Sequence, residues 1–209
     1  MTKENTTVKV LHISSGDLWA GAEMQLFTLD NALRKNTSTI VTLILFNHGE
    51  LEKKLLESDF HVIVLDESKL NGIQILKQLI GIIREIKPDV IHTHRSKENI
   101  LGSFAALFSG NIPTLRTAHG APEHKPEWNH IPKRLILFLD WFCGRFLQKN
   151  IIAVSGNLAG VLQKSFSADK IEVIENGIDA KSLFDSVQPK IPSTESTDTP
   201  FRIGIAGRL

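Results

Sequence analysis

The chain alternates between short apolar runs and longer amphipathic segments, and this alternation limits the folds that it can adopt. The short runs are rich in β-branched residues, as strands are, whereas Leu26, Leu29 and Leu33 recur at the spacing of a helix. The pattern predicts strands at 8–14, 39–46, 61–65, 89–94, 114–119, 151–155 and 171–174. It predicts helices at 21–35, 51–58, 73–86, 99–108, 133–147 and 158–166.

Strands that are apolar along their whole length are typical of a parallel sheet that is covered on both faces, with helices as the crossover connections. We therefore predict an α/β domain with a doubly wound, mostly parallel, Rossmann-like sheet of about seven strands. Ligands of such sheets bind beyond the carboxyl ends of the strands. The residues that directly follow each strand are the first candidates for a functional site.

The composition changes after residue 184, which predicts a domain boundary. Residues 1–184 form the predicted domain, and 185–200 read as a linker because Ser, Thr, Pro and charged residues replace the apolar pattern. An apolar run then returns at 201–206, with the sequence FRIGIA. We expect 201–209 to be the first strand of a second domain that this sequence does not complete.

The overall charge, the cysteine content and the first residues indicate the kind of partner and the compartment to expect. With 24 Lys and Arg against 23 Asp and Glu, the formal charge is +1, so the charge balance gives no support to a nucleic-acid partner. The single cysteine, Cys143, cannot form an internal disulfide, and it lies in an apolar run where a buried thiol is expected. The first residues lack the pattern of a signal peptide. We therefore expect a cytoplasmic protein.

One segment, 133–149, combines aromatic and aliphatic residues with the basic residues Lys133, Arg134, Arg145 and Lys149. A helix with so wide an apolar face is usually packed against a sheet, and this is the favoured interpretation. The alternative is a peripheral contact with the cytoplasmic face of a membrane, in which the basic rim meets the lipid headgroups.

The loop after the first predicted strand, SSGDLWAGAE, brings Gly16 and Gly21 to the start of a helix. Free backbone N–H groups at a helix N-terminus bind phosphate well, so Gly16, Gly21 and Glu23 are candidate substrate-binding residues. The alternative is that the glycines only shape the turn and that Glu23 complements the helix dipole. The dinucleotide pattern G-x-G-x-x-G is absent, which argues against a dehydrogenase, and no G-x-S-x-G indicates a hydrolase.

Histidines follow two further strands. His92, His94 and Arg95 come at the end of the fourth strand, and His119 comes at the end of the fifth. No carboxylate or cysteine stands at a familiar ligand spacing among them, so we predict no metal. Neutral imidazoles and an arginine suit hydrogen bonding to a polyhydroxylated or phosphorylated ligand. Alternatively, each histidine is a strand-end residue that hydrogen bonds within the domain.

Five motifs, taken in order, resemble the retaining glycosyltransferases of the group 1, or family 4-like, class, which have the GT-B fold. They are WAGAE at 19–23, DVIHTH at 89–94, TAHG at 117–120, AVSGNL at 153–158 with IENGIDAKSLF at 174–184, and IAGRL at 205–209. The resemblance covers essentially the whole chain. It implies that the chain is the N-terminal, acceptor-side half of such an enzyme, truncated at the start of the donor-binding half.

The resemblance also implies roles for single residues. His119 would lie beside the transferred sugar as the candidate catalytic residue, and His94 and Arg95 would face the acceptor. The family's Gly-Gly pair reads Ala20-Gly21 here. Three further substrate-binding residues follow from the resemblance, namely Asn176, Gly177 and Arg208, of which the first two would line the interdomain cleft. Arg208 would neutralise the diphosphate of the donor, so that no metal and no cofactor besides the nucleotide-sugar is implied.

These observations predict transfer of a sugar from a nucleotide-sugar to a saccharide or lipid-linked acceptor, as in the biosynthesis of a surface polysaccharide. We expect the isolated chain to be inactive, because the family's nucleotide pocket belongs to the second domain. Two alternatives remain open: an acceptor-binding module that works with a separate donor-binding chain, and a fragment without a function of its own. The apolar strand at 201–206 favours a piece of a longer enzyme, because an unpaired strand invites aggregation.

Overall fold

The computed structural model describes residues 7–36, 38–120, 131–178, 180 and 184. The chain divides into two compact units, Met1–Ile178 and Asp179–Leu209. The first unit ends at Ile178, whereas the predicted domain extends to residue 184, and the predicted boundary stays a prediction. The predicted linker at 185–200 and the predicted strand at 201–209, which includes Arg208, lie outside the described residues.

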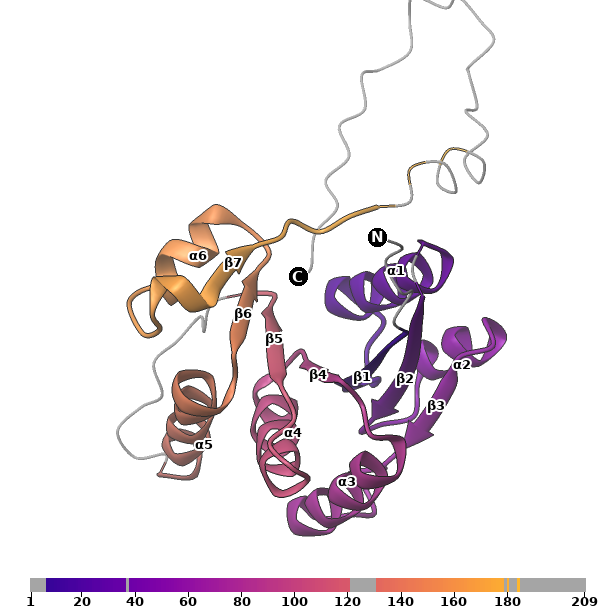
Figure 1. The fold of residues 1–209 in the computed structure, drawn as a ribbon, viewed down its shortest axis with the longest axis horizontal. Coiled ribbons are helices and arrows are strands. Elements are labelled where there is room, and N and C mark those ends of the chain that lie inside the picture. The colour runs from indigo at the N-terminus through magenta and orange to yellow at the C-terminus, as the bar shows by residue number, and fades with distance from the viewer. Residues whose placement is uncertain (1–6, 37, 121–130, 179, 181–183, 185–209) are drawn as a thin grey trace, which may run out of the picture. The chain divides into compact units, whose positions relative to one another are not determined.

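The first unit is built on a parallel sheet of seven strands, as the sequence predicts (Figure 1). The strands are β1 (Val8–Ser14), β2 (Thr39–Leu45), β3 (His61–Val64), β4 (Val90–Thr93), β5 (Thr114–Ala118), β6 (Asn150–Ala153) and β7 (Ile171–Val173). Their order in the sheet is β3-β2-β1-β4-β5-β6-β7. Strands β1 to β3 are added toward one edge of the sheet, and β4 to β7 are added toward the other edge. The strand order therefore reverses between β1 and β4, and doubly wound sheets bind ligands at such a switch point.

Six α-helices lie between the strands, within the described residues. They are α1 (Gly21–Asn36), α2 (Glu50–Glu57), α3 (Gly72–Ile86), α4 (Ser96–Phe108), α5 (Ile131–Phe142) and α6 (Gly156–Leu162). A π-helical turn, η1 (Cys143–Leu147), continues α5, and a 3₁₀ turn, η2 (Ala168–Lys170), precedes β7. Helix α3 starts at a capping box that Asn71 forms with Gln74, and it ends before Pro88, as predicted.

The hydrophobic core has two layers, one on each face of the sheet. On one face, Leu26 of α1 and Leu51 of α2 pack with Leu43 of β2. On the other face, the buried isoleucines and leucines of α3 and the alanines of α4 pack with Leu11 and Ile13 of β1. Because successive strand residues point to opposite faces, His12 between Leu11 and Ile13 must point toward α1.

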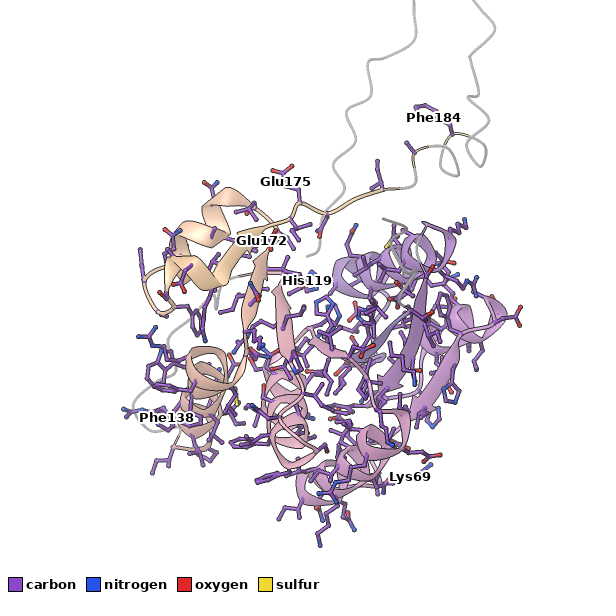
Figure 2. All side chains as sticks on the ribbon, in the orientation of Figure 1. Lys69, His119, Phe138, Glu172, Glu175 and Phe184 are labelled. Carbon is purple, nitrogen blue, oxygen red and sulfur yellow. The ribbon has the colours of Figure 1, made fainter. Side chains whose placement is uncertain are left out.

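Helix α5 differs from its prediction. The favoured interpretation is a helix whose apolar face packs against the sheet, and it holds only for the end of the segment. Helix α5 contains no buried residue, whereas Cys143 and Gly144 of η1 are buried. Leu135, Ile136 and Phe138 are exposed, and α5 packs instead beside α4 and η1. Figure 2 shows Phe138 on the outer side of the helix, away from the sheet. The buried thiol of Cys143 in the following turn agrees with expectation.

A buried polar network holds α4 and α5 to the sheet. Arg116 of β5 donates hydrogen bonds to both carboxylate oxygens of Asp140, each at 3.0 Å, and to its carbonyl oxygen at 2.7 Å. Asp140 also accepts a hydrogen bond of 2.9 Å from Asn99 of α4, whose amide oxygen accepts one of 2.6 Å from Thr93 of β4. Gly144 completes the fit, since a Cβ there would lie 2.3 Å from Nη2 of Arg116.

We predict that Asp140→Ala destabilises the domain by about 3 kcal/mol, because it leaves the buried guanidinium of Arg116 without its counter-charge. Urea unfolding would measure this loss. Glu50→Ala is the control: it removes an exposed carboxylate that pairs with Lys54 at the surface, and it should change the free energy of unfolding by less than about 0.5 kcal/mol. Equal effects of the two substitutions would contradict the structural role of the network.

Candidate functional site

Four histidines form a row on the α1 face of the sheet, at the carboxyl ends of β1, β4 and β5. His12 and His92 are direct partners in the pairing of β1 with β4. His94 points to the same face as His92 because it follows two residues later, and His119 relates in the same way to Thr117. The structure thus brings together His92, His94 and His119, as predicted from the sequence, and it adds His12.

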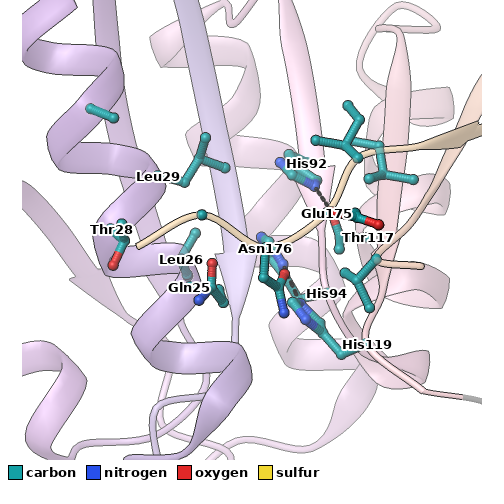
Figure 3. A pocket seen from close by; sticks show the side chains of 15 residues that line it. Gln25, Leu26, Thr28, Leu29, His92, His94, Thr117, His119, Glu175 and Asn176 are labelled. Carbon is teal, nitrogen blue, oxygen red and sulfur yellow. Dashed lines mark hydrogen bonds between the residues drawn. The ribbon is translucent and has the colours of Figure 1, made fainter. Parts of the chain in front are cut away.

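Hydrogen bonds link the rings of the row. Nδ1 of His12 lies 3.4 Å from Nε2 of His94, and Nδ1 of His94 lies 3.3 Å from Nε2 of His119. Nε2 of His92 lies 2.8 Å from the hydroxyl oxygen of Thr117. Figure 3 shows the last two contacts. The sequence left two interpretations of these histidines open: hydrogen bonding within the domain, and convergence on one site. The histidines of the row do both.

Asp30 of α1 lies behind the row. Its Oδ1 is 3.2 Å from Nε2 of His12, at an angle that makes no hydrogen bond, and neither of its carboxylate oxygens has a hydrogen-bond partner in the described part of the chain. Sequence reasoning missed both Asp30 and His12. The signal was present, because Asp30 stands between Leu26 and Leu33 on the apolar face of α1 and His12 interrupts an apolar strand.

Burial keeps the row uncharged. It lowers the pKa of His12 to about 3, and it also lowers the pKa of His92 and His94 well below the ordinary value, with neighbouring imidazoles adding to the effect. Burial likewise lowers the pKa of His119, against an opposing effect of Glu23. These histidines are therefore neutral donors and acceptors of hydrogen bonds at neutral pH.

The nitrogens of His12, His92 and His94 lie within 4.8 Å of one another, which raises the question of a metal ion. A tetrahedral zinc site with Zn–N bonds of about 2.1 Å needs nitrogens about 3.4 Å apart. The rings would have to move together to reach that geometry, and they hydrogen bond to their neighbours as they stand. That no metal binds here stays a prediction.

Two cavities meet at the row. The first, of about 250 Å³, lies between α1 and the strands β4 to β6, and both aliphatic side chains, such as Leu29, and polar ones, such as Gln25, line it (Figure 3). Asn176 and Gly177, both predicted binding residues, line it. The second, of about 580 Å³, is lined by charged side chains that include Arg95 and by Trp141 of α5. His119 lines both cavities, together with His94 and Thr117.

Arg95 and Glu23, two predicted binding residues, bind each other. The guanidinium of Arg95 pairs with the buried carboxylate of Glu23 and lies 3.3 Å from Asp17. The other carboxylate oxygen of Glu23 accepts a hydrogen bond of 3.2 Å from the backbone N–H of Ala20. Glu23 therefore supports the N-terminus of α1 and holds Arg95 at the rim of the second cavity. Direct contacts of either residue with a substrate stay predictions.

The two glycines of the first loop have different surroundings. A Cβ on Gly16 would lie 3.0 Å from the carbonyl oxygen of Asn47, and a Cβ on Gly49 would lie 2.0 Å from the carbonyl oxygen of Gly16. The loop after β1 thus packs directly against the loop after β2. A Cβ on Gly21 would meet open space. The predicted approach of a phosphate to Gly16 and Gly21 stays a prediction.

Residues 19–182 match the family model of Glycosyltransferase Family 4. The chain belongs to this family. A curated relative, the UDP-Gal:alpha-D-GlcNAc-diphosphoundecaprenol alpha-1,3-galactosyltransferase of Escherichia coli, is 25% identical over 189 residues. The match covers 88% of this chain and 48% of the relative, so the chain spans about half the length of that protein.

Solved structures show the same fold. Anabaena Alr3699/HepE in complex with UDP has a TM-score of 0.68 at 19% identity, over 83% of this chain and 45% of that one. The lipopolysaccharide outer core galactosyltransferase WaaB has a TM-score of 0.63 at 14% identity, over 82% and 46%. A UDP-N-acetylglucosamine 2-epimerase also matches, with a TM-score of 0.60 at 18% identity, over 82% and 49%. The fold is therefore shared with epimerases, and the family match distinguishes this chain from them.

We predict that the domain loses stability as the pH falls below about 6.5. His12 stays neutral in the folded protein down to a pKa of about 3, whereas in the unfolded chain it takes up a proton near pH 6.5. The unfolded state binds more protons between these values, so the contribution of His12 is complete above pH 6.5 and is lost as the pH falls. His12 alone should cost about 2 kcal/mol between pH 6.5 and 5.

Urea unfolding at pH 7.5, 6 and 5 measures this dependence. His12→Phe should make it shallower, leaving the part that comes from His92 and His94. His61→Asn, which removes an exposed imidazole of β3, should leave it as in the wild type. The same pH dependence in the wild type and in His12→Phe would show that burial of His12 is not the cause.

Proposed function

We propose that the chain is the acceptor-side half of a glycosyltransferase that transfers a sugar from a nucleotide-sugar to a saccharide or lipid-linked acceptor. The observation that carries the proposal is the position of His119, in the wall between two cavities at the carboxyl edge of a family 4 sheet. A residue placed there can hydrogen bond to a sugar that lies between donor and acceptor. We expect no cofactor besides the donor nucleotide-sugar.

The second cavity is the better candidate for the acceptor. It is the larger of the two, and it holds Arg95, whose guanidinium can donate to the oxygens of a diphosphate. It also extends to Trp141 of α5, and this helix has several exposed apolar side chains. The name of the relative from E. coli describes an acceptor with a sugar, a diphosphate and a lipid. A polar cavity beside an exposed apolar helix suits an acceptor of that chemistry.

We expect the chain to bind a water-soluble analogue of such an acceptor, with N-acetylglucosamine joined through a diphosphate to a short lipid. His119→Ala should weaken binding about tenfold, a change of about 1.4 kcal/mol, because one hydrogen bond to the sugar is lost. Isothermal titration calorimetry measures the affinity, with His61→Asn as a control that leaves it unchanged. Tight binding of NAD, or no effect of His119→Ala, would contradict the proposed site.

Sugar turnover separates the alternatives. The proposal expects no transfer by this chain alone, because the chain spans about half of the relative. An acceptor-binding module would gain transfer activity when a donor-binding chain is added, whereas a fragment without function would not bind the acceptor at all. Transfer by the chain alone would refute the division of roles between two halves.

We further propose that α5 and η1 rest on a lipid surface. Leu135, Phe138 and Phe146 are exposed by 56%, 55% and 61%, and Lys133 and Arg145 of the same segment are also exposed. Aromatic and basic side chains together favour the interface of an anionic membrane. None of the helices in the described ranges is long and apolar enough to cross a bilayer. Surface contact would bring the second cavity close to a lipid-linked acceptor.

Co-sedimentation with phosphatidylglycerol vesicles tests this surface. The double variant Phe138→Ser with Phe146→Ser should lower binding at least tenfold, because each buried phenylalanine contributes about 1.5–3 kcal/mol. Phe108→Ser is the matched control, since Phe108 at the end of α4 is also exposed, by 54%, and lies outside the proposed surface. Failure of the wild-type chain to sediment with these vesicles would refute the membrane contact.

A further inference from the structure

Asp30, His12, His94 and His119 lie in series from the interior to the wall of the cavities, and hydrogen bonds join the three histidines. The distances between successive partners are 3.2, 3.4 and 3.3 Å. His12 and His94 each use one ring nitrogen toward one neighbour and the second nitrogen toward the other. Nδ1 of His119 is the atom at which the chain ends. This relay joins a buried carboxyl group to the candidate catalytic residue.

A neutral imidazole carries one N–H donor and one bare acceptor nitrogen. When rings of this kind hydrogen bond in series, all of their N–H groups must point in the same direction along the series. If His94 donates to His119, then Nε2 of His119 is bare and its Nδ1 carries the hydrogen. The group at the buried end therefore selects the tautomer at the other end.

Asp30 is the group at the buried end, and its surroundings select the direction. The carboxyl group is fully buried, and within the described residues no lysine or arginine pairs with it. Burial raises its pKa well above the ordinary value, which favours the neutral form. As they stand, Asp30 and His12 are 3.2 Å apart and make no hydrogen bond. A neutral carboxyl group has an O–H that it can donate to Nε2 of His12 after a small rotation of either side chain. His12 then donates from Nδ1 to His94, and His94 donates from Nδ1 to His119.

We propose that Asp30, His12 and His94 are positioning residues that hold His119 in the uncharged tautomer with hydrogen on Nδ1. In this tautomer His119 can only donate from its free nitrogen, so it selects an oxygen acceptor on the ligand, such as a phosphate or sugar oxygen. Glu23 and Arg95 act on the pKa of His119 in opposite directions: the carboxylate raises it and the guanidinium lowers it. The identity of the ligand rests on the proposed function, whereas the tautomer does not.

Nitrogen-15 NMR of the histidine side chains reads each tautomer directly. In the wild-type chain at neutral pH, His12, His94 and His119 should each carry hydrogen on Nδ1. Asp30→Ala removes the group that selects the direction, and His12→Phe cuts the relay at its second member. Each substitution should convert His119 to a mixture of tautomers. Asp30→Asn should preserve the wild-type tautomer, because the amide N–H₂ can donate to His12 as the carboxyl group does.

Glu98→Gln is the matched control. Glu98 is also a buried carboxyl group with an elevated pKa, but it hydrogen bonds to Ser15, and no hydrogen bond or ion pair of the described residues joins it to the row. It should leave the tautomer of His119 unchanged. If Asp30→Ala does not fold, His12→Phe still tests the relay, and the wild-type spectrum tests the direction alone.

Three results would overturn the proposal. They are hydrogen on Nε2 of His119 in the wild type, an unchanged tautomer in both Asp30→Ala and His12→Phe, and a spectrum in which stoichiometric zinc shifts His12, His92 and His94 together. The last result would make the cluster a metal site. Acceptor binding is measured separately, so loss of the proposed function with the tautomer intact would leave the relay standing.

Discussion

The parallel pairing of β1 with β4 is the constraint on which the rest of the site depends. It joins the two halves of the doubly wound sheet and sets His12 directly beside His92. The alternation of side chains then separates two kinds of chemistry. His12, His92 and His94 point toward α1, whereas Ile13 and Ile91 point into the core with α3 and α4. A register shifted by one residue would bury the imidazoles in that core.

The two faces carry their polar groups for different reasons. On the face of α4 and α5, the charge of Arg116 is matched by Asp140, so the network is a structural tie between helices and sheet. On the α1 face, the polar groups are neutral rings beside the carboxyl group of Asp30, which has no hydrogen-bond partner among the described residues, and the row ends at two cavities. Polar groups that are buried yet incompletely satisfied lower stability, and they are common where a protein binds ligands.

The fold by itself leaves the function open, because an epimerase and glycosyltransferases share it with this chain at TM-scores of 0.60 to 0.68. Membership in family 4 is the reason why sugar transfer is the proposed reaction. The site then supplies the details. His119 lines both cavities, and in the proposed function it stands where donor and acceptor meet. Trp141 of α5, a helix with exposed apolar side chains, lines the larger cavity.

The sequence by itself determined the architecture and part of the site. Apolar runs and helical spacing predicted the seven strands and their helices, because local periodicity follows from the geometry of each element. The same periodicity indicated that His92, His94 and His119 follow strands and converge. Only the tertiary structure decided which helix face packs against which side of the sheet. Asp30 and His12 are 18 residues apart in the sequence, and they meet because α1 folds back onto the sheet. The tertiary structure also decided the exposure of α5. A wide apolar face in the sequence indicates that a helix has a partner, but it does not identify that partner.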